Sequence, residues 1–261
     1  MSTPMASPSS SESASAFDGS SPHAHRGGTD RRALPTQITA RFDVRTETVR
    51  ISGRNFRILV VRDTNALIDA IDPVRFADDD RLPYWAELWP SAIELARYCL
   101  RGSPYRGKRV LELGCGVGLA GIAAAQSGAT VTMTDVDEDA LLFARWNASV
   151  NLEPEILLQN VHMLRMDWRA PECPGKFDAV IGSDILYERP HFEPVLDILE
   201  NHLATDGCAT FTDPGRQTGV GFRLRAEERG FAVHSHRRVL GSERRPHAIV
   251  TFSLRRKEAA Q

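Results

Sequence analysis

Apolar residues along the chain follow two different spacings. Near the N-terminus, apolar and polar side chains alternate from Ile38 to Ile51, and a second apolar run covers residues 56–61. The residues between these runs, 52–55, read Ser-Gly-Arg-Asn, which is typical of a turn. Alternation on both sides of a turn predicts a β-hairpin over residues 38–61.

From residue 90 onward, helical and strand patterns alternate. Pro90 occupies the first position of a predicted helix, whose apolar face includes Ile93, Leu95 and Cys99. Further helices are predicted over residues 117–126, 138–150, 192–203 and 219–228, and strands over residues 109–113, 130–134, about 161–166, 177–183, 208–212, 231–237 and 247–254. This alternation indicates an α/β fold with a mostly parallel sheet covered by helices on both faces. No helix separates the last two strands, so we expect them to form an antiparallel hairpin at one edge of the sheet.

The first 36 residues differ in composition from the rest of the chain. Ser, Ala, Pro, Gly and His dominate this segment, and Phe17 is nearly its only large apolar side chain. Such a segment buries too little surface to offset its ordering entropy, so we predict a disordered tail over residues 1–36. Residues 37–261 are predicted to form one domain, with a β-extension over 37–81 and a catalytic core over 82–261.

Charge and cysteine content exclude several classes of protein. The formal net charge of −2 disfavours a surface built for nucleic-acid phosphates, which needs clustered Lys and Arg. The four cysteines form no C-x-x-C pair, so neither a disulfide framework nor a metal site is indicated. No apolar run reaches the roughly 18 residues of a membrane span, and no secretory signal is present. We expect a soluble cytoplasmic protein without membrane or nucleic-acid partners; its oligomeric state is not determined, and a monomer is favoured.

A glycine-rich turn follows the first predicted strand of the core. It contains Gly114, Gly116 and Gly118, with Glu112 two residues before the first glycine. Glycines let a ligand approach the backbone, and the first strand-to-helix turn of an open α/β sheet lies where nucleotide-like ligands bind. A dinucleotide fingerprint requires a third glycine at position 119, where this chain has leucine, so the spacing disfavours NAD and a dehydrogenase.

Acidic residues follow the later strands of the predicted sheet. Asp135 closes the second strand, 21 residues after Gly114, where a carboxylate accepts hydrogen bonds from ribose hydroxyls. The structural alternative is a helix N-cap, but Asp137 is better placed for that role. At the end of the fourth strand the chain reads Ser183-Asp184-Ile185-Leu186-Tyr187, a D-x-x-Y sequence without prolines.

These landmarks together resemble class I S-adenosylmethionine-dependent methyltransferases, and within them the D-x-x-Y protein-lysine methyltransferase family. The resemblance extends from about residue 82 to 203, and its landmarks are Tyr84-Trp85-Ala86-Glu87-Leu88-Trp89-Pro90, the glycine turn, Asp135, Asp167-Trp168 and D-x-x-Y. It implies a Rossmann-like sheet of seven strands, S-adenosyl-L-methionine as the cofactor, and a lysine of a protein substrate as the methyl acceptor. The N-terminal hairpin also fits, since the family often has a β-extension over the active site.

The same resemblance implies roles for individual residues. Cofactor-binding roles fall on Trp89, Glu112, Gly114, Gly116, Gly118, Asp135, Asp167, Trp168 and Ser183, with Asp167 and Trp168 at the adenine. Asp184 is expected to orient the acceptor nitrogen, and Tyr187 to contribute its hydroxyl or its ring face beside the cationic centre. The structural alternatives are that Trp89 holds its helix against the sheet, that Asp184 caps a turn and that Tyr187 packs there.

The sequence is also compatible with other functions. A methyltransferase acting on protein arginine or a small amine is one alternative, because the glycine turn recognises the cofactor and not the acceptor. The absence of prolines from the D-x-x-Y sequence and the negative net charge disfavour methylation of nucleic-acid bases. A non-catalytic module that binds S-adenosylmethionine is an alternative of another class, and the presence of both Asp184 and Tyr187 argues against it.

Overall fold

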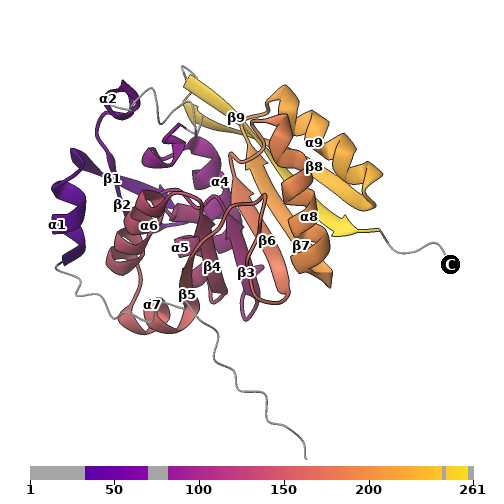
Figure 1. Ribbon diagram of the computed structural model, residues 1–261, viewed down its shortest axis with the longest axis horizontal. Helices are drawn as coiled ribbons and strands as arrows, with labels where there is room; N and C mark the ends of the chain where they lie inside the picture. The colour runs from indigo at the N-terminus through magenta and orange to yellow at the C-terminus, as the bar shows by residue number, and fades with distance from the viewer. Residues whose placement is uncertain (1–32, 70–81, 243–244, 258–261) are drawn as a thin grey trace, which may run out of the picture.

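The computed structural model describes residues 33–69, 82–242 and 245–257 (Figure 1). The predicted disorder of residues 1–32 and the end of the predicted β-extension, residues 70–81, therefore lie outside the described residues. Within the described ranges, no helix combines the length and the apolar character that crossing a membrane requires.

A seven-stranded sheet forms the centre of the part of the chain that the structure describes. Its strands, in their order across the sheet, are β5 (Val161–Arg165), β4 (Thr130–Asp135), β3 (Arg109–Leu113), β6 (Phe177–Ser183), β7 (Leu203–Asp213), β9 (Arg245–Arg256) and β8 (Phe231–Ser242). The first five are parallel neighbours, and β9 is antiparallel to both β7 and β8. The predicted fold class and the antiparallel hairpin at the edge are confirmed.

Helices cover both faces of the sheet because successive strand residues point to opposite sides. These helices are α4 (Pro90–Leu100), α5 (Leu119–Gln126), α6 (Glu138–Asn151), α7 (Pro154–Asn160), α8 (Phe192–His202) and α9 (Gln217–Glu228). Val110 and Ile181 join the core that includes the apolar residues of α4, α5 and α6. Leu111 and Val180, their immediate neighbours in sequence, join a second core with α8 and α9.

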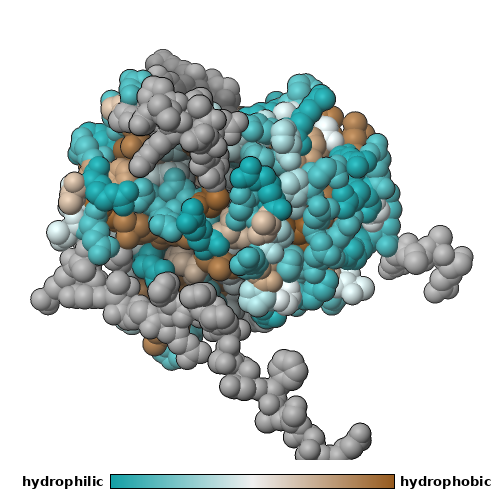
Figure 2. Space-filling view, in the orientation of Figure 1, coloured by the Kyte–Doolittle hydropathy of each residue, from teal (hydrophilic) through white to brown (hydrophobic). Residues whose placement is uncertain are grey.

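The surface over α8 and α9 is mostly hydrophilic (Figure 2). Arg225 on α9 and Arg229, directly after this helix, both form ion pairs with Glu193 on α8, so charged side chains join the two helices at the surface. The apolar face of α8 and Phe222 and Ala226 of α9 are buried against the sheet, whereas Val220 and Leu224 of α9 are exposed.

The N-terminal part of the domain contains a separate two-stranded sheet, as predicted. It consists of β1 (Val44–Ile51) and β2 (Arg54–Val61), which are antiparallel. The prediction of a strand from Ile38 is wrong, because helix α1 (Ala33–Thr39) covers this position and also takes up residues 33–36 of the predicted tail. Ile38 and Phe42 are four residues apart, which fits one helical turn as well as strand alternation. The hydrogen bond from Phe42 N to Ile38 O shows which of the two the chain adopts.

Several boundaries differ from the sequence predictions. Helix α5 begins at Leu119 rather than at residue 117, because Gly118 has a left-handed backbone with φ +88°. Strand β7 begins at Leu203, five residues earlier than predicted, with an irregular register against β6. Helices α2 (Thr64–Asp69) and α7 were not predicted, although Pro154 at the first position of α7 is a recognisable start signal.

Asparagines on α6 tie the N-terminal sheet to the core. The fully buried Asn147 accepts a hydrogen bond from Leu59 N (2.7 Å) and donates to Leu59 O (3.1 Å) and Val117 O (2.9 Å). One helical turn later, Asn151 forms the same pair of bonds with the backbone of the exposed Arg57. The two amide side chains thus satisfy backbone groups of β2 much as a neighbouring strand would.

We expect Asn147→Ala to lower the free energy of unfolding by about 2–4 kcal/mol, since it leaves buried backbone groups unpaired at about 1–3 kcal/mol each. Asn151→Ala is the matched control and should cost less than about 1 kcal/mol, because water can replace its bonds at the surface. Urea unfolding of both variants measures the difference. Equal losses of unfolding free energy in the two variants would contradict the larger role assigned to the buried Asn147.

Candidate functional site

The carboxyl ends of β3, β4 and β6 lie at one edge of the sheet, because these strands are parallel neighbours. The glycine turn follows β3, Asp135 ends β4, and Ser183 ends β6 and is half-buried. Three segments that the sequence analysis assigned to one site are therefore brought together by the fold.

The three predicted glycines of the turn have left-handed backbones and different surroundings. Their φ angles are +60° at Gly114, +50° at Gly116 and +88° at Gly118, a conformation that favours glycine. A Cβ at Gly118 would lie 2.9 Å from Ala144 Cβ, so glycine there permits the close packing of α5 and α6. A Cβ at Gly116 would meet nothing closer than Trp85 O, at 3.5 Å. Trp85 therefore lies at ordinary contact distance from this position.

Glu112 lies inside the sheet beneath this turn. One carboxylate oxygen, Oε1, accepts a hydrogen bond from Gly121 N (3.1 Å), and the other, Oε2, is buried without a partner among the described residues. Burial raises the pKa of Glu112 to about 8, and the nearby charge of Asp135 acts in the same direction. The sequence analysis did not identify Gly121. Because Gly121 has no side chain, the Glu112 carboxylate fits beside it.

Asp135 holds the glycine turn against the end of β4. Its Oδ2 accepts from Gly116 N and its Oδ1 from Asp137 N, both at 3.0 Å. Burial raises its pKa to about 6, although these backbone bonds oppose the shift. The alternative N-cap role belongs to Asp137, which accepts from Asp139 N (2.8 Å) as expected.

Asp167 and Trp168 follow β5, and their side chains have different surroundings. The Asp167 carboxylate pairs with the guanidinium of Arg169 (2.6 Å) at the surface. Trp168 packs over the glycine turn, since a Cβ at Gly114 would lie 3.1 Å from Trp168 Cζ2. Gly114 thus makes room for an indole ring as well as for the turn.

A chain of aromatic rings connects the predicted aromatic residues. Trp89 caps α4 and donates its indole N–H to Tyr84 O (2.8 Å) in the 3-10 turn η1 (Tyr84–Ala86). The Tyr84 ring contacts the rings of Trp89 and Tyr187, and His191 of η2 (Arg189–His191) contacts those of Tyr187 and Trp168. Tyr84 and His191 are members of this cluster that the sequence analysis did not assign.

Tyr187 lies within the electrostatic reach of both Asp135 and Arg216. Burial, followed by the charge of Glu188, raises its pKa to about 12; Asp135 raises it further and Arg216 lowers it. The phenol therefore stays neutral at physiological pH and can donate a hydrogen bond.

Asp184 has an unusual backbone and a charged partner. Its φ is +60°, one of three left-handed non-glycine residues in the described chain, and its backbone N–H donates to Thr212 O (2.8 Å). Such a conformation costs on the order of 1–3 kcal/mol and is typical of functional sites. The carboxylate accepts a hydrogen bond from the Arg216 guanidinium.

Arg216 joins Asp184 to a second carboxylate, that of Asp213. The Asp213 side chain is fully buried, accepts from Gly215 N and Arg216 N (both 2.7 Å), and forms an ion pair with the Arg216 guanidinium (3.2 Å). Two carboxylates thus share one cation. The sequence analysis missed Arg216 and Asp213, although Asp-Pro-Gly-Arg at the end of the strand beside β6 was an available signal.

Comparison with known families decides the classification. The sequence model of a family described as lysine methyltransferase matches residues 74–218, which is more than half of the chain. The chain belongs to this lysine methyltransferase family. The resemblance that the sequence analysis recognised is therefore confirmed, and with it S-adenosylmethionine as the cofactor.

Individual relatives in and around the lysine methyltransferase family cover part of the chain. It is 34% identical over 148 residues to the electron transfer flavoprotein beta subunit lysine methyltransferase of Mus musculus, covering 55% of either chain. Identity to the protein N-lysine methyltransferase METTL21A of Danio rerio is 37% over 139 residues, 51% of this chain and 62% of the relative. A histidine protein methyltransferase 1 homolog of Dictyostelium discoideum is 29% identical over 151 residues, 54% and 47% of the two chains. The chain spans about half the length of the curated relatives it matches.

A solved structure supports the fold. The ribosomal protein L11 methylase of Lactobacillus delbrueckii subsp. bulgaricus superposes with a TM-score of 0.50 and 22% identity, covering 66% of this chain and 81% of that one. At this identity the likeness concerns the fold alone.

The described residues of this family member fit S-adenosylmethionine chemically. The cofactor has an ammonium group and ribose hydroxyls that donate hydrogen bonds, and both need acceptors. Such acceptors at the glycine turn are Glu112 Oε2, which has no partner among the described residues, and the Asp135 carboxylate.

The raised pKa of Glu112 predicts a pH dependence of stability. An ordinary glutamate has a pKa of about 4.3, so between about pH 4.3 and 8 the folded protein binds more protons at this site than the unfolded chain does. Stability therefore falls as pH rises through this window. The slope contributed by one fully linked proton is about 1.4 kcal/mol per pH unit.

Between pH 6.5 and 8, we expect the free energy of unfolding to decrease less steeply in Glu112→Gln than in wild type. This range lies above the raised pKa of Asp135, about 6. Guanidinium unfolding without cofactor measures the decrease. Glu172→Gln, at an exposed position, is the control and should keep the wild-type slope. A Glu112→Gln slope as steep as that of the control would show that Glu112 is not protonated in the folded protein.

Proposed function

We propose that this protein is an S-adenosylmethionine-dependent N-methyltransferase that methylates a lysine side chain of a protein substrate. The observation that carries the proposal is Asp184: a left-handed residue at the carboxyl end of β6, with a largely buried carboxylate, three residues before Tyr187. Family membership and the names of two relatives support lysine over other acceptors.

On the cofactor side, Glu112 and the glycine turn hold the amino-acid end, and Asp135 accepts hydrogen bonds from the ribose. We assign the adenine to Asp167 and Trp168, and contacts beside the methyl donor to Trp89 and Ser183. The cofactor supplies a methyl group on a sulfonium, which already contains the leaving group. The protein therefore needs to align the acceptor and exclude water rather than to provide acid catalysis.

On the acceptor side, the lysine amine enters among the aromatic rings of Tyr84 and Tyr187. Burial favours the neutral amine, so the ammonium releases its proton to solvent on entry. The neutral nitrogen then has a lone pair available for the methyl group that the bound cofactor would supply. Asp184 accepts a hydrogen bond from the attacking nitrogen and orients it, and the ring faces favour the positive charge that develops there.

Arg216 sets the charge of the acceptor pocket in this proposal. With Asp184 and Asp213 it gives a local net charge of −1, which favours the positive charge that develops on the acceptor nitrogen during transfer. The Asp184 side chain is 11% exposed, so its carboxylate is accessible from one side while Arg216 covers another. Because Arg216 offsets one of the two carboxylates, the pocket is complementary to a single positive charge, that of the methylated nitrogen.

The proposal also covers the cellular location, the partners and the oligomeric state of the protein. We place the protein in the cytoplasm, with a protein as its partner and neither nucleic acid nor membrane, and we propose a monomer. Fractionation of source cells and light scattering of the purified protein test these points.

Incubation of the protein with lysate of the source cells and methyl-labelled S-adenosylmethionine tests the proposed function. Mass spectrometry should locate the label on a lysine of one or a few proteins. Label on histidine, arginine, a small molecule or RNA would overturn the acceptor but not the cofactor chemistry. Binding of the cofactor without any transfer would indicate a non-catalytic module.

The Asp184→Asn variant should transfer methyl groups about 10- to 150-fold more slowly than wild type in the same assay, the equivalent of one hydrogen bond to a charged group of about 1.5–3 kcal/mol. Asp206→Asn, an exposed change on β7, is the matched control and should keep the wild-type rate. A wild-type rate for Asp184→Asn would remove the proposed role of Asp184.

A further inference from the structure

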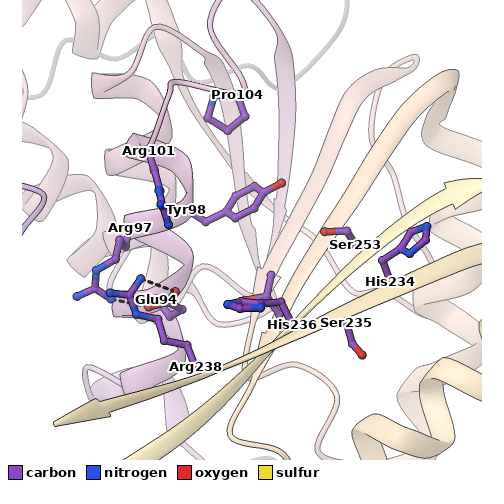
Figure 3. A pocket seen from close by; sticks show the side chains of 11 residues that line it. Glu94, Arg97, Tyr98, Arg101, Pro104, His234, Ser235, His236, Arg238 and Ser253 are labelled. Atoms are coloured by element: carbon purple, nitrogen blue, oxygen red, sulfur yellow. Dashed lines mark hydrogen bonds and ion pairs between the residues drawn. The ribbon is translucent and has the colours of Figure 1, made fainter.

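A cleft of 380 Å³ lies between helix α4 and the edge strands β8 and β9, apart from the acids of the candidate site (Figure 3). One wall includes Arg97 and Tyr98 of α4 and Arg101 directly after it, and the other includes His236 and Arg238 of β8. Its volume is near the lower end of the range of about 300–1,000 Å³ typical of ligand sites.

The cleft exists because this face of the edge hairpin is not covered by a helix in the described structure. Alternate residues of β8 point to the same side, so His234, His236 and Arg238 share a face, and His236 is paired with Thr251 of β9. Helix α9 packs on the other face of β8. The two histidines are exposed.

The walls of the cleft have an excess of positive charge. Three arginines, Arg97, Arg101 and Arg238, accompany one carboxylate, Glu94, which pairs with Arg97 (2.5 Å) and lies 3.7 Å from Arg238 (Figure 3). The whole chain has a formal net charge of −2, so this excess is local.

A short path of contacts leads from this cleft to the acceptor pocket. Thr212 O accepts from Asp184 N, and Thr212 Oγ1 donates to Ser91 O (2.9 Å) in the first turn of α4. Thr251, which lines the cleft, is the strand partner of Thr212. Neighbouring strand positions therefore link the backbone of Asp184 to the wall of the cleft.

We propose that this cleft binds an acidic segment of the protein acceptor, close in sequence to the lysine that is methylated. The inference rests on the proposed function and adds a specificity determinant to it. Arginines form paired hydrogen bonds with carboxylates, and the Tyr98 and Thr251 hydroxyls and the His236 ring add further donors. An acidic segment matches these donors in charge.

Carboxylates fit this surface better than nucleic-acid phosphates do. A protein that binds a nucleic acid typically neutralises several phosphates along a basic stripe. Here two of the three arginines, Arg97 and Arg238, lie beside a buried carboxylate, Glu94, and none of the described residues that line the cleft is a lysine. The surface suits two or three acidic side chains rather than a continuous phosphate backbone.

Fluorescence anisotropy of fluorescein-labelled hexaglutamate with the full-length protein at low ionic strength tests the proposal. Hexalysine and a labelled dodecamer of uridylate serve as comparison probes. We expect hexaglutamate to bind most tightly and its affinity to decrease with salt, since exposed charges are screened over about 10 Å at 0.1 M salt. The double variant R101Q/R238Q should bind it about tenfold more weakly, since two charged contacts are lost.

The matched control is R54Q/K176Q, which removes two exposed charges away from the cleft and should bind within about twofold of wild type. Thermal melting of both variants checks that they fold. Equal binding by the two variants, no binding of hexaglutamate, or preference for the uridylate probe would overturn the proposal. These assays need no methyl transfer, so labelled lysine in the lysate experiment can stand when the cleft proposal fails.

Discussion

The pairing of the Asp135 carboxylate with the backbone of the glycine turn determines the geometry of the candidate site. Gly116 N and Asp137 N both donate to this side chain, so the turn after β3 is fixed against the end of β4. Beneath it, Glu112 holds Gly121 N and the start of α5. Both carboxylates are buried, which costs free energy that the backbone donors only partly offset, as their raised pKa values indicate. A cofactor that brings donors to these acids would relieve that cost.

Buried negative charge has different partners on the cofactor side and on the acceptor side of the site. Glu112 and Asp135 accept from backbone donors and pair with no cation in the part of the chain that the structure describes, which suits a ligand that itself brings positive charge and hydroxyls. Asp184 and Asp213 share the guanidinium of Arg216, which leaves one negative charge for an acceptor. The aromatic rings of Tyr84, Tyr187 and His191 lie in a connected series from Trp89 to Trp168. Their hydrophobic surfaces limit access of water to the charges.

Much of this arrangement could be predicted from the sequence because it is local. The strand patterns, the glycine spacing and Asp135 depend on residues close together in the chain, and the order of strands follows from the resemblance. The helix at Ile38 was missed because a four-residue repeat fits two structures, and tertiary burial of Ile38 decides between them. Arg216 was missed because its meaning depends on Asp184, 32 residues away, which only the pairing of β6 with β7 brings near. The basic cleft likewise depends on the packing of α4 against the last two strands, which local patterns do not specify.

The central claim is that Asp135 and Asp184 have separate tasks, the first for the cofactor and the second for the acceptor. Calorimetric titration of S-adenosylmethionine into Asp135→Asn and Asp184→Asn proteins tests it most directly. The account predicts an affinity about 10- to 150-fold lower for Asp135→Asn, the equivalent of one charge-assisted hydrogen bond of about 1.5–3 kcal/mol, and an affinity within about twofold of wild type for Asp184→Asn. Wild-type affinity in Asp135→Asn, or an equal loss in both variants, would contradict it.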